Sequence, residues 1–92
     1  MQPHLSNILE DISKQVTDRE IEILQLISFG FSTERIADML YISFETVRTH
    51  RKNLLQKFRA NNVALLIRRG FENGLICAHR QNHFDTLKEK QN

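Results

Sequence analysis

Seven basic side chains and one acidic side chain lie within residues 43–71, which gives this segment a formal charge of +6. The whole chain carries only +2, because acidic residues outnumber basic ones before position 43. Ammonium and guanidinium groups concentrated in this way bind phosphates and release their condensed counterions. We therefore expect one face of the protein to meet a polyanion. The basic residues are Arg48, Arg51, Lys52, Lys57, Arg59, Arg68 and Arg69, and the acid is Glu45.

Helix-start signals predict the elements that position these cations. Thr17 and Glu20 form a capping box, in which each side chain can satisfy a free backbone amide of the first turn. Ser32 and Ser43 repeat the start signal as N-cap residues, and a fourth start lies at Asn61-Asn62. Gly30 is placed to end the first helix in a left-handed conformation. We expect helices from about 18 to 29, from 33 to 40, from 43 to 58 and from 63 to 73.

The second and third helices are separated by only about three residues, 41–43. Such a short connection forces a sharp bend and is typical of a helix-turn-helix. In the third helix Val47, Leu54 and Phe58 share one apolar side, while the basic residues fall on other faces. The pattern predicts a helix with one side in the core and a cationic side facing outward.

Composition and the two ends of the chain complete the predicted architecture. With 92 residues, three Gly and one Pro, the chain favours a single small all-α domain. Leu5, Ile8, Leu9 and Ile12 recur at helical spacing, which predicts a short amphipathic helix within residues 1–15. We expect one compact domain over residues 16–76 and a polar tail over residues 77–92.

The order and spacing of short motifs resemble the LuxR-type (LuxR/FixJ/GerE) helix-turn-helix across about 60 residues, 16–76. This resemblance implies a four-helix fold, and a bacterial transcription regulator that binds double-stranded DNA through its third helix. The sequence departs from the usual pattern at Phe58-Arg59-Ala60, where many members have Leu, Gly and Val. The matching residues are Thr17-Asp18-Arg19-Glu20, Ile23-Leu24, Gly30, Ile36-Ala37, Leu40-Tyr41-Ile42-Ser43, Thr46-Val47-Arg48, His50, Asn53-Leu54, Lys57-Phe58 and Gly74-Leu75-Ile76.

The resemblance also assigns roles to individual side chains. Arg48, Thr49 and Lys52 match the positions that contact base edges, and their residue types suit guanine and thymine in the major groove. Other residues are expected to contact the DNA backbone through cations, hydroxyls or helix-start amides. These are Ser32, Thr33, Ser43, Thr46, Arg51, Lys57 and Arg59.

Two protein partners are considered besides DNA, and the first is a second copy of this chain bound through the fourth helix. Leu65, Arg69 and Glu72 share a side of this helix away from its apolar stripe of Val63, Leu66, Ile67 and Phe71, and we expect them to form a homodimer contact. A second hypothesis is a protein-interaction module that contacts RNA polymerase or another regulator.

No residue pattern indicates an enzyme or a cofactor. The sequence has no glycine-rich phosphate loop and no nucleophile with a base at motif spacing. His50 is expected to be partly buried between the core and the DNA rather than catalytic. A third hypothesis, a metal-sensing regulator, would use Cys77, His79 and His83, but with no second Cys or His cluster we predict no metal site.

Location follows from what the sequence lacks. A single cysteine cannot form an internal disulfide, and neither a signal peptide nor an apolar stretch of about 20 residues is present. We therefore expect a cytoplasmic protein with no membrane contact. With about 15 residues before the capping box, the chain is similar to the stand-alone regulators of the family, or is a fragment.

Overall fold

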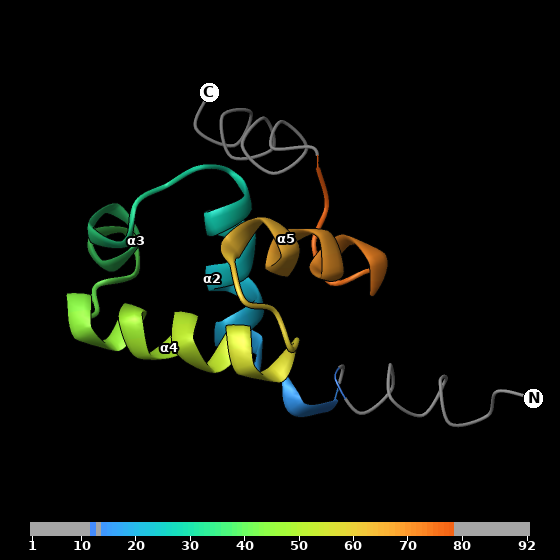
Figure 1. Ribbon diagram of the computed structural model, residues 1–92. Coiled ribbons are helices and arrows are strands. Elements are labelled where there is room, and N and C mark those ends of the chain that lie inside the picture. The colour runs from blue at the N-terminus through green and yellow to red at the C-terminus, as the bar shows by residue number, and fades with distance from the viewer. Residues whose placement is uncertain (1–11, 13, 79–92) are drawn as a thin grey trace, which may run out of the picture.

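The computed structural model describes residues 12 and 14–78, and its regular elements there are four helices without a strand (Figure 1). The predicted all-α, four-helix fold is therefore confirmed. Most of the predicted N-terminal helix and of the polar tail lies outside the described residues. The helices are α2 (Asp18–Ser28), α3 (Thr33–Leu40), α4 (Phe44–Lys57) and α5 (Val63–Glu72).

Each helix begins at a cap that the sequence predicts. The capping box of α2 is complete, because Thr17 Oγ1 accepts from the Glu20 amide at 3.1 Å and Glu20 Oε1 accepts from the Thr17 amide at 3.0 Å. The other three caps are Ser32, Ser43 and Asn62, each accepting the amide three residues onward. Local hydrogen bonds thus define the three-residue turn between α3 and α4.

The core forms around α2, which packs against α3, α4 and α5. In Figure 1, α4 runs along one edge of the domain, with α3 next to its start. Because α4 also packs against α3 and α5, only part of its circumference faces solvent. The largest fully buried side chains come from all four helices and the residue after α4: Ile23, Leu24, Ile36, Val47, Leu54, Phe58 and Leu66.

Phe71 does not belong to the core, contrary to the predicted apolar stripe of α5. Its side chain is 40% exposed, whereas Leu66 is fully buried. At about 100° per residue, Phe71 points about 140° away from Leu66. Gly70 takes the inward position instead, and an added Cβ there would lie 3.0 Å from both Ile76 and Leu24 side-chain carbons.

All four helices end in the same hydrogen-bonded motif, but only two of them use glycine. In this motif a left-handed residue follows the helix and the next amide binds a carbonyl five residues back, as Phe31 N does with Leu26 O. Gly30 and Gly74 supply the left-handed residue after α2 and α5. Tyr41 (φ 58°) and Arg59 (φ 53°) supply it after α3 and α4. Two residues that carry a Cβ therefore adopt a backbone conformation that favours glycine. One lies just before α4 and the other just after it.

We predict that Arg59→Gly raises the free energy of unfolding by about 1 kcal/mol, because glycine adopts a positive φ without the Cβ penalty. Urea unfolding followed by circular dichroism measures this change. Arg59→Ala is the control, since it removes the charge but keeps the Cβ. An equal gain in both variants would assign the effect to charge instead of backbone conformation.

Candidate nucleic-acid interface

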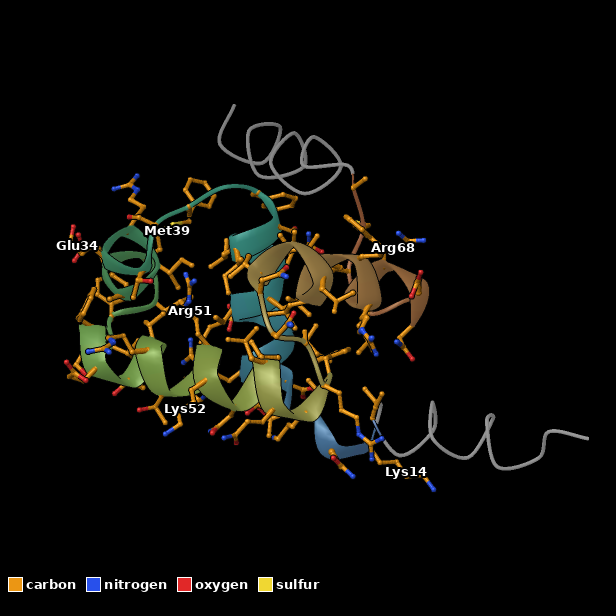
Figure 2. All side chains as sticks on the ribbon, in the orientation of Figure 1. Lys14, Glu34, Met39, Arg51, Lys52 and Arg68 are labelled. Carbon is orange, nitrogen blue, oxygen red and sulfur yellow. The ribbon has the colours of Figure 1, made fainter. Side chains whose placement is uncertain are left out.

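The outer face of α4 gathers the three residues expected to contact bases. Arg48, Thr49 and Lys52 are exposed, whereas Val47 and Leu54 on the opposite side are fully buried. Together with Glu45 they line a shallow depression of about 220 Å³. Figure 2 shows Lys52 pointing away from the rest of the domain. The helix therefore has the two sides that the sequence predicts, one in the core and one cationic.

A second hollow, of about 340 Å³, lies between the start of α3 and α4. Arg51 points toward α3 (Figure 2), and its Nη1 donates to Thr33 Oγ1 at 3.1 Å. This bond connects two residues expected to contact the DNA backbone. Arg48 lies at the same hollow, with its guanidinium carbon 6.0 Å from the centre of the Phe44 ring. Arg48, Arg51 and Lys52 of α4 thus line one hollow together with Thr33, the first residue of α3.

The hydroxyl residues at the helix starts are exposed but have local hydrogen bonds. Ser32 and Ser43 act as N-caps, and Ser43 Oγ lies 2.8 Å from Thr46 Oγ1. The cap role of Ser32 and Ser43 is confirmed, and it explains these residues without any DNA contact. Arg59 is also exposed, past the other end of α4 and about 16 Å along its axis from Arg48.

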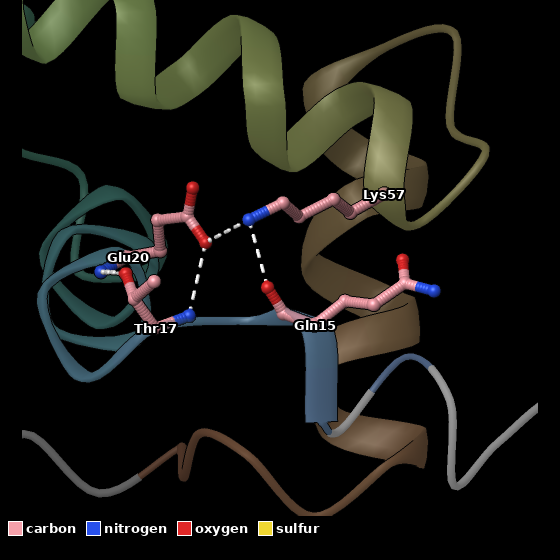
Figure 3. A network of polar contacts seen from close by, with 4 residues as sticks. All are labelled: Gln15, Thr17, Glu20 and Lys57. Atoms are coloured by element: carbon pink, nitrogen blue, oxygen red, sulfur yellow. Dashed lines mark hydrogen bonds and ion pairs between the residues drawn. The ribbon is translucent and has the colours of Figure 1, made fainter.

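Lys57 differs from the other cations of α4, because its ammonium group faces the domain. Lys57 Nζ donates to Glu20 Oε1 at 2.7 Å and to the Gln15 carbonyl oxygen at 2.8 Å (Figure 3). The Glu20 side chain is only 4% exposed, so this ion pair is largely buried. The position of Lys57 therefore supports a structural role and not the backbone contact expected from the sequence.

The pKa of Glu20 reflects two opposing effects. Burial of the carboxyl raises its pKa. The hydrogen bonds from Lys57 and Thr17 and the positive charge of Lys57 together lower it by more, so the pKa of Glu20 lies below its usual value. Glu20 is therefore ionised in the folded protein at neutral pH. It caps α2 and holds α4 with the same carboxylate.

The contacts of Arg51 and Lys57 could not be read from the sequence. They join residues 18 and 37 positions apart, and no local motif links such distant positions. His50 is half-buried, as expected, and its Nδ1 has no hydrogen-bond partner among the residues described.

The described part of the chain was expected to hold neither a metal ion nor a membrane-spanning segment. Residues 12 and 14–78 contain no group of three His, Cys, Asp or Glu side chains arranged to hold a metal ion. Cys77 is exposed and unpaired, while His79 and His83 lie outside the described residues. None of the helices described here has both the length and the apolar character needed to cross a membrane.

Comparison with known proteins decides the family. Residues 14–69 match the family described as bacterial regulatory proteins, luxR family. The chain belongs to the luxR family. The solved structure of the transcription factor GerE superimposes with a TM-score of 0.67 at 34% identity, over 70% of this chain and 96% of GerE. The members of this family are described as bacterial regulatory proteins.

Longer proteins named as transcriptional regulatory proteins are similar to this chain over part of their length. The chain is 34% identical over 67 residues to the uncharacterized transcriptional regulatory protein YxjL of Bacillus subtilis, covering 73% of this chain and 31% of YxjL. It is 39% identical over 61 residues to the transcriptional regulatory protein DegU of Brevibacillus brevis, covering 66% of this chain and 26% of DegU. The chain thus spans about a third or less of the length of these relatives.

We predict that Lys57→Met lowers the free energy of unfolding by about 2–3 kcal/mol at neutral pH, because it leaves the Glu20 carboxylate buried without its cation. The folded pKa of Glu20 lies below the unfolded value. Stabilisation by the pair is therefore complete above the ordinary pKa of glutamate and is lost as the pH falls through the lowered one. Denaturant unfolding across this range should show the difference between the two proteins shrinking in acid.

Lys52→Met is the matched control, since Lys52 is an exposed lysine on the same helix, and its stability should change by less than about 0.5 kcal/mol. If Lys57→Met kept full stability but lost affinity for DNA, Lys57 would be a DNA contact after all.

Proposed function

We propose that this chain is a sequence-specific transcription regulator that binds double-stranded DNA with α4 in the major groove. The observation that carries the proposal is the two-sided character of α4, with its core side fully buried and its outer side formed by Arg48, Thr49 and Lys52. The side chains of Thr49 and Lys52 make no hydrogen bond or ion pair with other described residues, so they are available to a ligand. The family and the relatives named as transcriptional regulators support the same function.

Three residues are assigned to base recognition. Arg48 and Lys52 have donors suited to the O6 and N7 acceptors of guanine, and the Thr49 methyl group suits the thymine methyl. All three lie in the first three turns of α4, the part of a recognition helix that penetrates deepest into the groove.

Contacts to the DNA backbone are assigned to residues around this helix. Arg51 and Thr33 are already joined across the hollow between α3 and α4, where a phosphate can bind both. Arg59 keeps its charge in a left-handed conformation that favours glycine, which supports a requirement for the cation itself. The remaining assigned residues are Ser32, Ser43 and Thr46.

A homodimer through α5 is part of the proposal. Leu65 and Arg69 are half-buried and Glu72 is exposed, so each retains surface for a second subunit. A dimer related by twofold symmetry would place two α4 helices on half-sites about one helical turn apart.

Selection of bound duplexes from a random pool tests the proposal, and a motif with two inverted half-sites is expected. Arg48→Ala and Lys52→Ala should each weaken binding to the selected motif by about 1–3 kcal/mol relative to random DNA, because each loses a specific base contact. Fluorescence anisotropy at several salt concentrations measures both affinities.

Arg19→Ala on α2 is the control, because it also removes an exposed cation and should leave discrimination unchanged. Equal losses on selected and random DNA would instead make Arg48 and Lys52 backbone contacts. Affinity that does not depend on salt would contradict phosphate binding altogether.

A further inference from the structure

Glu45 is the one acidic residue of α4, and it lies on the face proposed to enter the major groove. Its side chain is 77% exposed and lines the same depression as Arg48, Thr49 and Lys52. Every other charged side chain at this depression is basic. A carboxylate here would approach the DNA together with the cations.

Stability of the domain explains this carboxylate only in part. Its place in the first turn of α4 suits the helix dipole, but this effect is small at an exposed site. Glu45 Oε2 lies 3.5 Å from Arg48 Nη1, but both side chains are more than 60% exposed, and such surface pairs contribute little. The start of α4 is already capped, because Ser43 Oγ accepts from the Thr46 amide at 3.0 Å. Near phosphates a carboxylate is repelled, so it lowers affinity unless it meets a hydrogen-bond donor.

The major groove offers such donors only on two bases. Adenine and cytosine each present an amino group, but the adenine amino group lies beside the N7 acceptor, which repels a carboxylate. Cytosine presents its 4-amino group without a neighbouring acceptor of its own, and it is the usual partner of Glu and Asp.

The spacing of Glu45 and Arg48 suits two adjacent contacts. Three residues correspond to about 4.5 Å along the helix axis, close to the rise of about 3.4 Å between base pairs. In the structure the carboxylate and the guanidinium lie side by side, with 3.5 Å between Glu45 Oε2 and Arg48 Nη1. A cytosine donor and a guanine acceptor edge in the same arrangement would satisfy both groups.

We propose that Glu45 is a specificity-determining residue whose carboxylate accepts a hydrogen bond from a cytosine 4-amino group next to the guanine contacted by Arg48. This inference rests on the proposed function, because it deepens the account of how α4 reads DNA. It predicts that each half-site contains a cytosine whose preference depends on Glu45.

The test compares motifs selected by the wild-type protein, Glu45→Gln and Arg48→Ala. Arg48→Ala marks the guanine position. Glu45→Gln should abolish an approximately tenfold preference for cytosine beside it and shift that position toward adenine, which a glutamine amide binds through N6 and N7. All other positions of the motif should stay the same.

Glu22→Gln provides a matched control. Glu22 pairs with Arg19 at 3.3 Å with the same three-residue spacing, but on α2. The control removes the same charge and should leave the selected motif unchanged. Thermal unfolding should show that all three variants fold.

A second measurement removes the proposed donor from the DNA. Replacing that cytosine with pyrimidin-2-one deletes its amino group, and the wild-type protein should lose about tenfold in affinity. Glu45→Ala should lose much less, because it makes no bond to this group.

Two results would overturn the inference. If Glu45→Gln changes affinity for every sequence equally and keeps the cytosine preference, Glu45 acts only through charge or by positioning Arg48, and the proposed function still stands. If the wild-type protein selects no motif, the proposed function fails, and this inference fails with it.

Discussion

The ion pair between Glu20 and Lys57 fixes how α4 lies against the rest of the domain. It joins the first turn of α2 to the last residue of α4, and the same carboxylate completes the capping box that begins α2. Phe58, the next residue, is fully buried beside it. Because one end of α4 is held by this pair and its Val47–Leu54 side by the core, the opposite side must carry Arg48, Thr49 and Lys52 outward. The direction of the proposed DNA-binding face therefore depends on a contact far from that face.

Backbone conformations that disfavour most side chains occur on both sides of α4. Tyr41 and Arg59 adopt a positive φ, whereas Gly30 and Gly74 adopt it after α2 and α5. The ends of α2 and α5 thus use glycine, the residue that adopts a positive φ with the smallest loss of free energy. Tyr41 is also 95% exposed, so packing of its side chain does not explain its presence in the turn. At about 1–2 kcal/mol for each such residue, these two turns reduce stability on both sides of the helix proposed to meet DNA.

Local signals in the sequence predicted the fold closely. The caps at Thr17, Ser32, Ser43 and Asn62 placed all four helix starts, because capping depends on residues only three positions apart. The prediction that Phe71 belongs to the apolar stripe of α5 was wrong, since Gly70 and Ile76 fill the space beside Leu24. The partners of Lys57 and Arg51 were not predictable, because tertiary packing alone brings Glu20 and Thr33 next to them. Charge therefore indicated which segment is cationic, but not which cations face outward.

The most direct test of this account is a titration of the protein with a selected duplex, followed by ¹H–¹⁵N nuclear magnetic resonance spectra. We expect the largest amide shift changes at residues 43–52 and at the start of α3. Residues of the Glu20–Lys57 pair should change little, because this contact stays formed within the complex. Large changes on the exposed side of α2, with residues 43–52 unaffected, would contradict DNA binding by the outer face of α4.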